Sequence, residues 1–454
     1  MLEIMTDYVC PRCGTRAPGT ALTWCCPRCR GPWDLAVASA PVPLASLPSR
    51  VNSLWRYAEA LPLATGIARV TGAAGAAARG GVTGTGGVPP VSLGEGRTPL
   101  VPLTDTVSAK LDFLMPTLSF KDRGAVMLAE LARRLEPRTV IADSSGNAGT
   151  AVAAYCARAG LDCAVYVPEG TSPKKLEQIR AHGARTLVVP GDREATARAA
   201  RAAADEPGVF YASHVYNPHF LHGTKTYVYE IWEDLGGRLP DTLVLPVGNG
   251  TLLLGAALAV EELYGHGLVD RRPALVAVQA EAVSPLAAAF HAGADDLVGG
   301  GGRAGANERA GANDPDGAAG RAGTDNRAGA DNRARASNRA GAGDLSGADG
   351  LSAPAAAVAR PTLAEGIAIP NPPRAAQILR AVRASGGTFL TVPEDSIRAA
   401  QLDLARRGLY VEPTAVACWA AVRATPPGPG TAVLPLCGAG AKTGLAAAAD
   451  PSGE

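Results

Sequence analysis

The amino-acid sequence predicts an α/β fold built from two domains. From about residue 110 onward, short apolar runs typical of buried strands alternate with longer stretches of helical character. This alternation predicts parallel sheets covered by helices on both faces. Seven or more strands fit two domains, and a chain of 454 residues with 47% hydrophobic residues is long enough to form a core in each.

Composition and charge exclude several classes of partner. A formal net charge of +1 gives no sign of a surface for nucleic acid or membrane lipid. No apolar run approaches the roughly 20 residues that a membrane span needs. The segment Met1–Asp7 lacks the basic start and apolar stretch of a signal peptide. We therefore expect a cytoplasmic protein that binds neither nucleic acid nor membranes.

The N-terminal segment carries a pattern typical of a metal site. Two C-x-x-C pairs, Cys10 with Cys13 and Cys26 with Cys29, are separated by twelve residues. Four thiolates at this spacing are typical of the tetrahedral zinc of a zinc ribbon, which is structural because no coordination position stays open. Cys25 is an alternative to Cys26 as a ligand. A cluster of free, reduced thiols is the alternative to a metal site.

The region that follows shows little pattern until about residue 90. Within it, the Gly/Ala/Thr-rich run Thr71–Gly87 predicts a loop. Beyond it, helices are expected at Thr150–Arg158 and near Pro173–Ala181. Strands are expected at Thr139–Ala142, Cys163–Val167, Arg185–Val189, Thr242–Val247, Ala274–Val278 and Ala432–Leu436.

Residues 298–353 interrupt the alternation with recurring Arg-Ala-Gly and Asn-Arg-Ala units. Large apolar residues are nearly absent, so the segment cannot offset its ordering entropy by burial. We predict a disordered surface insert. Contact between its arginines and an anionic partner is the alternative.

Two of the strand-to-helix junctions are rich in glycine and polar residues. Asp143–Gly149 places flexible backbone and a helix N-terminus where a substrate carboxylate could bind, and the Asn147 amide could reach a cofactor hydroxyl. An ordinary helix cap is the alternative. The second junction offers backbone amides and a hydroxyl to a phosphate monoester, and it lacks the spacing of a nucleoside-triphosphate loop. Its residues are Gly248, Asn249, Gly250 and Thr251.

A third junction, Leu436–Gly444, follows the last predicted strand. It would bring the thiol of Cys437 to the same edge of the sheet, since sites in open α/β folds form where strands end and helices begin. A buried structural cysteine is the alternative.

The run Pro116–Gly124 carries Lys121 directly ahead of an apolar, helix-like stretch. A partly desolvated lysine near a helix start has a lowered pKa and reacts as a neutral amine. The sequence thus offers an amine that could bind an aldehyde, a loop that could bind a phosphate group and the polar junction at Asp143–Gly149. Together these three features predict a pyridoxal phosphate pocket. An ordinary surface lysine is the alternative.

In this order, the motifs resemble those of the fold-type-II pyridoxal-phosphate enzymes, a tryptophan synthase β-like superfamily, and most closely the threonine synthase family. They are S-F-K-D-R-G at Lys121, S-S-G-N-A-G at Asn147, P-V-G-N-G at Gly248 and L-C-G-A-G-A-K at Cys437. Leu93–Leu100 is similar to the family's L-G-E-G-x-T-P-L motif. Further similar blocks are G-T-K-T at 223–226, A-E-G-I at 364–367 and V-E-P-T-A at 411–415. Some family members also begin with a zinc ribbon.

The resemblance implies two three-layer α/β/α domains preceded by the zinc ribbon, and a homodimer. The ribbon would span residues 1–40. The large cofactor-binding domain would comprise residues 41–125 and 235–445 and carry the 298–353 insert. The small α/β domain would span residues 126–234.

The resemblance also implies roles at matching positions. Lys121 would bind the cofactor covalently and then move protons at the substrate carbons, and Asn147 would bond the ring hydroxyl. Cys437 stands where the family usually has a threonine or serine facing the pyridine nitrogen, and a neutral partner there suits elimination and replacement more than transamination. The cofactor phosphate would lie on Gly248, Asn249, Gly250 and Thr251, and the substrate carboxylate beside Ser145, Gly146 and Ala148.

Two departures from the family motif lie beside the lysine. Met115 and Leu118 replace a polar residue and a glycine, which could reshape the substrate side of the pocket. O-phosphohomoserine is the substrate that the resemblance to threonine synthases implies, and its phosphate would need further cationic and hydroxyl groups. The candidates for that substrate site are Thr98, Ser119, Arg123 and Lys225.

We therefore predict a pyridoxal-phosphate-dependent lyase acting on an amino acid. The first hypothesis is a threonine synthase, which converts O-phosphohomoserine and water into threonine and phosphate. One alternative is a β-replacement synthase or a threonine or serine ammonia-lyase of specialised metabolism. The other is a non-catalytic zinc-ribbon binding protein that retains a degenerate enzyme fold.

Overall fold

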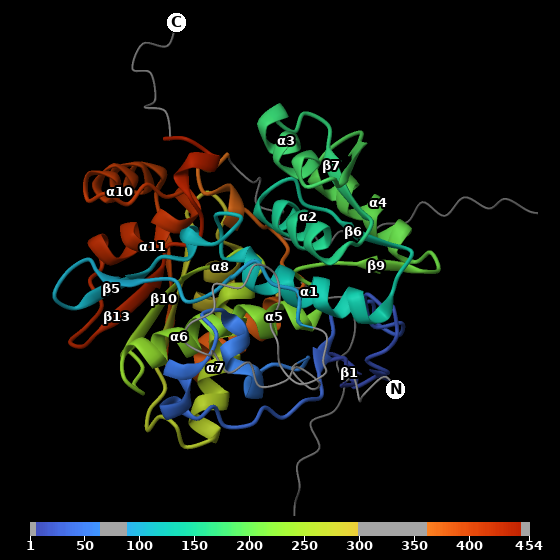
Figure 1. The fold of residues 1–454 in the computed structure, drawn as a ribbon. Helices are drawn as coiled ribbons and strands as arrows, with labels where there is room; N and C mark the ends of the chain where they lie inside the picture. Colours follow the sequence, from blue (N-terminus) through green and yellow to red (C-terminus); the bar gives the residue numbers. More distant parts are fainter. Residues whose placement is uncertain (1–5, 64–88, 298–360, 446–454) are drawn as a thin grey trace, which may run out of the picture. The chain divides into compact units, whose positions relative to one another are not determined.

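The computed structural model describes residues 6–63, 89–297 and 361–445. The predicted loop at Thr71–Gly87 and the predicted insert at 298–353 lie outside these residues. Strands alternate with helices through the described part of the chain, so the predicted α/β class is confirmed (Figure 1). Among the described residues, no helix combines the length and apolar character needed to cross a membrane.

The N-terminal ribbon is a small antiparallel sheet with the strand order β2-β1-β3. Its strands are β1 (Tyr8–Val9), β2 (Arg16–Ala17) and β3 (Asp34–Leu35). Two 3-10 helices, η1 (Leu44–Ser49) and η2 (Leu54–Ala60), follow where the sequence shows little pattern. The indole of Trp55 in η2 donates to the carbonyl of Val91 at 3.0 Å, so this segment packs against the body of the chain.

A four-stranded sheet, all parallel, has the order β8-β7-β6-β9. Its strands are β6 (Thr139–Ala142), β7 (Cys163–Pro168), β8 (Arg185–Val189) and β9 (Val209–Tyr211). The first three are confirmed to within one residue of the predicted bounds. The sequence analysis did not identify β9, which has only three residues.

Helices cover both faces of this sheet, as Figure 1 shows around β6, β7 and β9. They are α1 (Lys121–Leu135), α2 (Asn147–Ala159), α3 (Pro173–Ala181) and α4 (Arg193–Ala204). Side chains alternate along β6: Val140 belongs to the core formed with α1 and α2, and Ile141 to the core formed with α4. The predicted three-layer arrangement follows from this alternation.

The larger sheet has six strands in the order β12-β11-β10-β13-β5-β4. Five are parallel, and β4 pairs antiparallel with β5 at the edge, which the expectation of purely parallel sheets missed. The connection from β4 to β5 is too short for a parallel crossover. The strands are β4 (Leu100–Pro102), β5 (Val107–Lys110), β10 (Thr242–Pro246), β11 (Ala274–Ala280), β12 (Thr388–Val392) and β13 (Ala432–Pro435).

The larger sheet is also covered by helices. Helix α11 (Pro413–Ala424) packs along β10 to β13, and α7 (Thr251–Gly265) and α9 (Ala375–Ala384) contact β11. The remaining elements of this part of the chain are η3 (Asp112–Leu114), α5 (Pro218–Thr224), α6 (Thr226–Asp234), α8 (Pro285–His291), η4 (Glu365–Ile367), α10 (Glu394–Arg406) and η5 (Gly440–Lys442).

The described residues of the ribbon and of both sheets belong to one compact unit. The predicted domain boundaries at residues 40, 125 and 234 stay predictions. The carboxyl ends of β6, β10 and β13 lead into the three glycine-containing junctions of the sequence analysis. These junctions position the site.

Candidate active site and metal centre

A cavity of about 800 Å³ lies at the carboxyl ends of strands from both sheets. In open α/β sheets this edge is where ligands bind, because strand ends and helix starts meet there. Ten of the predicted site residues line the cavity together. They are Lys121, Ser145, Gly146, Asn147, Ala148, Gly248, Asn249, Gly250, Thr251 and Cys437.

Lys121 is the first residue of α1 and opens on the cavity. Its Nζ lies over the rings of Phe120, 4.3 Å from the centroid, and Phe220, at 5.6 Å. Close approach of α1 to Phe220 requires glycine at position 124, where a Cβ would lie 2.4 Å from that ring. Burial lowers the pKa of the Lys121 amine to about 8, against the opposing effect of the Glu412 carboxylate. The amine is therefore partly neutral near neutral pH and available as a nucleophile.

The junction after β6, residues 143–146, leads directly into α2. Glycine is required at position 149, since a Cβ there would lie 1.7 Å from the carbonyl oxygen of Ser144. The turn leaves the first amides of α2 without partners inside the helix, and these amides face the cavity where an anionic group can bind.

The side chain of Asn147, the first residue of α2, points to Glu412. Its Nδ2 donates to both carboxylate oxygens of Glu412, at 3.2 and 3.0 Å. Glu412 is buried, and burial raises the pKa of its carboxyl, while the bond from Asn147 lowers it. The pair fixes the Asn147 amide beside the cavity.

The loop between β10 and α7 forms the opposite wall. Gly250 has φ +79°, and a Cβ there would lie 2.3 Å from Ile378, so only glycine fits. The loop ends at the N-terminus of the 15-residue helix α7, whose first amides and the Thr251 hydroxyl suit a phosphate group. The Asn249 amide lies 3.5 Å from Nε2 of His214, which also lines the cavity.

Cys437 follows β13 and is buried beside Lys121. Burial raises the pKa of its thiol well above the usual value, so the thiol stays neutral at physiological pH. Its carbonyl accepts the backbone N–H of Phe120 at 2.9 Å, and Ser119 pairs with Gly438 in a β-bridge. These bonds fix the lysine loop to the end of the strand.

Four residues considered for substrate binding lie outside the cavity lining. The Thr98 hydroxyl donates to Asp112 at 2.7 Å. Ser119 is fully buried. Arg123 pairs with Asp112 and Glu230, and Lys225 with Glu262. All four belong to the packed interior of the protein.

The two departures from the family motif also lie outside the cavity lining. The sulfur of Met115 accepts the N–H of Gly96 at 3.2 Å, and its side chain is buried. Leu118 has φ +62° and is 41% exposed. Neither side chain restricts the described cavity.

The structure adds cavity-lining residues to which the sequence analysis gave no role. They are Lys175, Arg193, His214, Glu412 and Lys442. Burial, together with the charges of Lys121 and Arg193, holds the pKa of His214 well below its usual range. Its side chain is therefore a neutral acceptor and donor. Glu412 lies in the block V-E-P-T-A and Lys442 ends the motif L-C-G-A-G-A-K, so the sequence singled out these two positions. The other three come to the cavity through strand pairing and helix packing.

Cys10, Cys13, Cys26 and Cys29 form a candidate metal centre. Their Sγ atoms all lie within 4.8 Å of one another, and three of the pairs are 3.4, 3.5 and 3.6 Å apart. Zinc–sulfur bonds of about 2.3 Å in a tetrahedron separate sulfurs by about 3.8 Å, so the cluster fits zinc. Cys25 packs instead in the core with Trp24, and this decides between the two neighbouring thiols.

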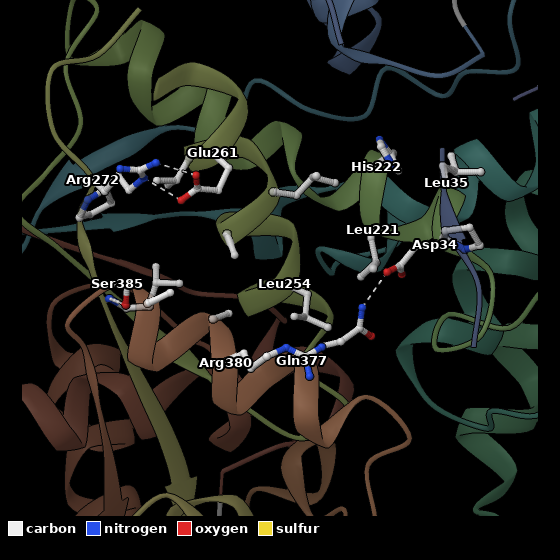
Figure 2. A pocket seen from close by; sticks show the side chains of 18 residues that line it. Asp34, Leu35, Leu221, His222, Leu254, Glu261, Arg272, Gln377, Arg380 and Ser385 are labelled. Carbon is white, nitrogen blue, oxygen red and sulfur yellow. Dashed lines mark hydrogen bonds and ion pairs between the residues drawn. The ribbon is translucent and has the colours of Figure 1, made fainter. Parts of the chain in front are cut away.

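A second cavity, of about 670 Å³, lies among β3, α5, α7 and α9 (Figure 2). It is lined mainly by apolar side chains such as Leu254 and Leu221, with the ion pair of Glu261 and Arg272 at one side. None of the predicted site residues lines it.

The chain is similar in sequence to known proteins. The family described as "Pyridoxal-phosphate dependent enzyme" matches residues 91–309 and 329–438, which is most of the chain. Threonine synthase of Methanosarcina acetivorans is 27% identical over 431 residues, covering 92% of this chain and 86% of that protein. Threonine synthase of Mycobacterium tuberculosis (strain H37Rv) is 38% identical over 206 residues, covering 43% of this chain and 57% of its own length.

Solved structures resemble this chain in fold. An L-serine ammonia-lyase from Rhizomucor miehei has a TM-score of 0.56 at 16% identity, covering 75% of this chain and 93% of its own. A threonine deaminase from Solanum lycopersicum, in its processed form, has a TM-score of 0.53 at 18% identity, covering 75% of this chain and 83% of its own. Maize serine racemase has a TM-score of 0.54 at 15% identity, with 76% and 88% covered.

Proposed function

The chain belongs to the family of pyridoxal-phosphate dependent enzymes, and from this we propose that it is a lyase of the threonine synthase type. It would convert O-phosphohomoserine and water into threonine and phosphate, by γ-elimination of phosphate and addition of water at the β carbon. The observation that carries this proposal is the 27% identity to the threonine synthase of Methanosarcina acetivorans over 92% of the chain. That alignment extends well beyond the family match and supports a common substrate class.

The cavity residues fit pyridoxal phosphate. Lys121 would hold its aldehyde carbon, Asn147 its ring hydroxyl and the neutral Cys437 thiol its ring nitrogen. The cofactor, when bound, supplies an electron sink for charge that develops on the substrate carbons. The loop of Gly248, Asn249, Gly250 and Thr251 would hold the cofactor phosphate through backbone amides and a hydroxyl.

The remaining groups of the cavity would handle the substrate. Ser145, Gly146 and Ala148 border the free amides of α2, which suit the substrate carboxylate. The Lys121 amine, once released from the cofactor by the substrate, would take a proton from one substrate carbon and return it to another. Its lowered pKa suits a group that alternates between the neutral and charged forms near neutral pH.

The substrate phosphate would bind to cations that line the cavity. Arg193 lines the cavity and forms no ion pair with any described residue, and Lys175 pairs only with the exposed Glu365. Both guanidinium and ammonium groups bind phosphate. These two residues replace the buried Arg123 and Lys225 as candidates for this role.

One observation favours a second function. The Lys121 amine is faced by the phenyl rings of Phe120 and Phe220, and the neutral His214 lines the same cavity. These three neighbours offer no positive charge to a substrate phosphate. A smaller substrate such as threonine or serine would fit these surroundings, and the reaction would then be loss of ammonia.

The experiment that separates these functions uses the full chain with pyridoxal phosphate. Incubation with O-phosphohomoserine should release phosphate and threonine in equal amounts, and Lys121→Ala should release neither. Formation of 2-oxobutyrate from threonine, or pyruvate from serine, without phosphate release from O-phosphohomoserine, would establish the ammonia-lyase instead.

We also propose that the protein is a homodimer and acts in the cytoplasm. Light scattering after size-exclusion chromatography should give twice the mass of the chain. A mass equal to 46.0 kDa would contradict the dimer.

A further inference from the structure

The cysteine ribbon is bonded to the wall of the cofactor cavity through backbone contacts. Trp33, directly ahead of β3, is buried and stacks on Tyr8 with ring centroids 5.8 Å apart. Its backbone N–H donates to the carbonyl of Tyr216 at 3.1 Å. The ring of Tyr8 in turn meets the edge of His219 at 6.0 Å. The ribbon thus contacts the turn that precedes α5 and the first residues of that helix.

Arg374 joins the same segments from the other side. Its fully buried guanidinium donates from Nε to the carbonyl of Val215 at 2.8 Å, and also to the carboxylate of Asp34 at 2.7 Å and the carbonyl of Trp33. Gln377 completes this cluster, bonding Arg374 and Asp34 at 2.8 Å each, the latter bond visible in Figure 2. One side chain therefore holds the ribbon, the turn before α5 and the start of α9.

The turn held by Arg374 carries a cavity residue. His214 immediately precedes Val215 and lies 3.5 Å from the amide of Asn249 in the phosphate loop. Phe220, in the helix that follows, meets His214 edge-on at 5.9 Å and lies 5.6 Å from the Lys121 amine. Displacing this turn would move groups that face both the lysine and the phosphate loop.

We propose that Arg374 is a positioning residue that couples the metal-bound state of the ribbon to the geometry of the cofactor cavity. The ribbon strands have two residues each and their buried core is small, so a bound metal is what fixes Trp33 and Asp34 in place. Arg374 transmits that placement to Val215, and Val215 to His214. This inference rests on cofactor binding and is independent of which amino acid is the substrate.

The test compares cofactor affinity with zinc content in the full-length protein. Arg374→Met removes the bonds to Val215, Asp34, Trp33 and Gln377. We expect this variant to keep one zinc per chain while its dissociation constant for pyridoxal phosphate rises at least about tenfold, the size of effect expected when a charged hydrogen-bond cluster is lost. Chelation of zinc from the wild type should raise the constant by a similar factor, and added Zn²⁺ should reverse the effect. Chelation of Arg374→Met should change it no further, because the two changes act on one path.

A matched control is available on the same helix. Arg383 in α9 donates to the carbonyl of Ala294 and pairs with Asp295, away from the ribbon. Arg383→Met should bind zinc and cofactor like the wild type. Arg374→Lys, which keeps a donor near the two carbonyls, should recover part of the affinity.

Three results would overturn the coupling. They are unchanged cofactor affinity in folded Arg374→Met, equal further losses on chelation in the variant and the wild type, and a chelated wild type that binds cofactor normally. The last result decides the matter even if Arg374→Met fails to fold. A change confined to thermal stability, with the same cofactor absorbance and affinity, would also reduce Arg374 to a structural role.

Discussion

Two cations that lie two residues apart at the start of α1 have opposite surroundings. Arg123 is fully buried and donates to both oxygens of Asp112 and of Glu230, at distances from 2.5 to 2.8 Å. Lys110 is a second buried cation paired with Glu230, at 3.0 Å. Lys121 forms no ion pair with a described carboxylate and faces two phenyl rings and the cavity.

This difference indicates that the charge of Arg123 stabilises the fold, whereas the amine of Lys121 is available for chemistry. Charges that are buried in pairs hold elements together, and removing one partner leaves the other uncompensated. A partly buried amine without an ion-pair partner is held in a costly environment, and such groups concentrate at functional sites. We therefore propose that Lys121 has a chemical role and Arg123 a structural one. Four substitutions or conditions test this difference.

The largest expected effect is on activity at Lys121. Lys121→Ala should lower kcat/KM by about 10⁴-fold or more, the scale of losing a group that acts covalently. The free energy of unfolding should stay equal to that of the wild type or rise, because no ion pair is lost. Steady-state kinetics and urea denaturation measure the two quantities. A variant that is both inactive and strongly destabilised would contradict the distinction.

Arg123 should show the reverse. Arg123→Met should reduce the free energy of unfolding by about 3–5 kcal/mol, since Asp112 and Glu230 would remain as buried, partly unpaired charges. The control on the same helix is Arg133→Met. Arg133 is 29% exposed, and its buried partner Glu130 would keep its bonds from Arg134 and from the Val91 N–H, so a loss of only about 1 kcal/mol is expected. Equal losses in the two variants, measured by urea denaturation, would contradict the assignment.

The pH dependence of cofactor capture reports on Lys121 alone. Only the neutral amine attacks the aldehyde, and burial lowers its pKa from 10.5 to about 8. The rate at which apoprotein binds pyridoxal phosphate should therefore rise with pH and be half-maximal near pH 8. Stopped-flow absorbance between about pH 6 and 10 measures this rate. A rate still rising steeply above about pH 9.5 would indicate an exposed lysine, with its ordinary pKa of about 10.4.

Thr98 should show the smallest effect. Thr98→Val removes the bond to Asp112, which keeps its two bonds from Arg123, so stability should fall by about 1 kcal/mol. Because Thr98 does not line the cavity, KM should stay within about twofold of the wild type, the change expected when no substrate contact is lost. A large rise in KM with unchanged stability would return Thr98 to the substrate site.

Sequence patterns located most of the fold, and the misses have physical causes. Strands such as Cys163–Pro168 and Thr242–Pro246 are mostly apolar runs bounded by turn residues, so their positions can be predicted from the sequence. The three-residue β9 and the edge strand β4 are too short for a periodic signal. The 3-10 helices between residues 44 and 60 gain their order from tertiary contacts such as that of Trp55, which local sequence does not encode.

The same limit applies to the site. Glycines at positions such as 149 and 250 are readable, because close backbone approach leaves no room for a side chain. Arg123 and Lys225 are candidates for the substrate phosphate from sequence alone, because sequence gives the charge of a side chain but not its direction. Their carboxylate partners, Glu230 and Glu262, lie more than thirty residues away in the chain. Arg374 and its link to the ribbon likewise depend on contacts more than 150 residues apart.

The most direct measurement identifies the residue that carries the cofactor. The full-length protein with pyridoxal phosphate is reduced with borohydride, which fixes the cofactor to the amine that holds it, then digested and examined by peptide mass spectrometry. The peptide containing Lys121 should carry the mass of one reduced cofactor, and no other lysine peptide should. A cofactor attached to Lys175 or Lys442, which line the same cavity, or to no lysine, would contradict the assignment of chemistry to Lys121.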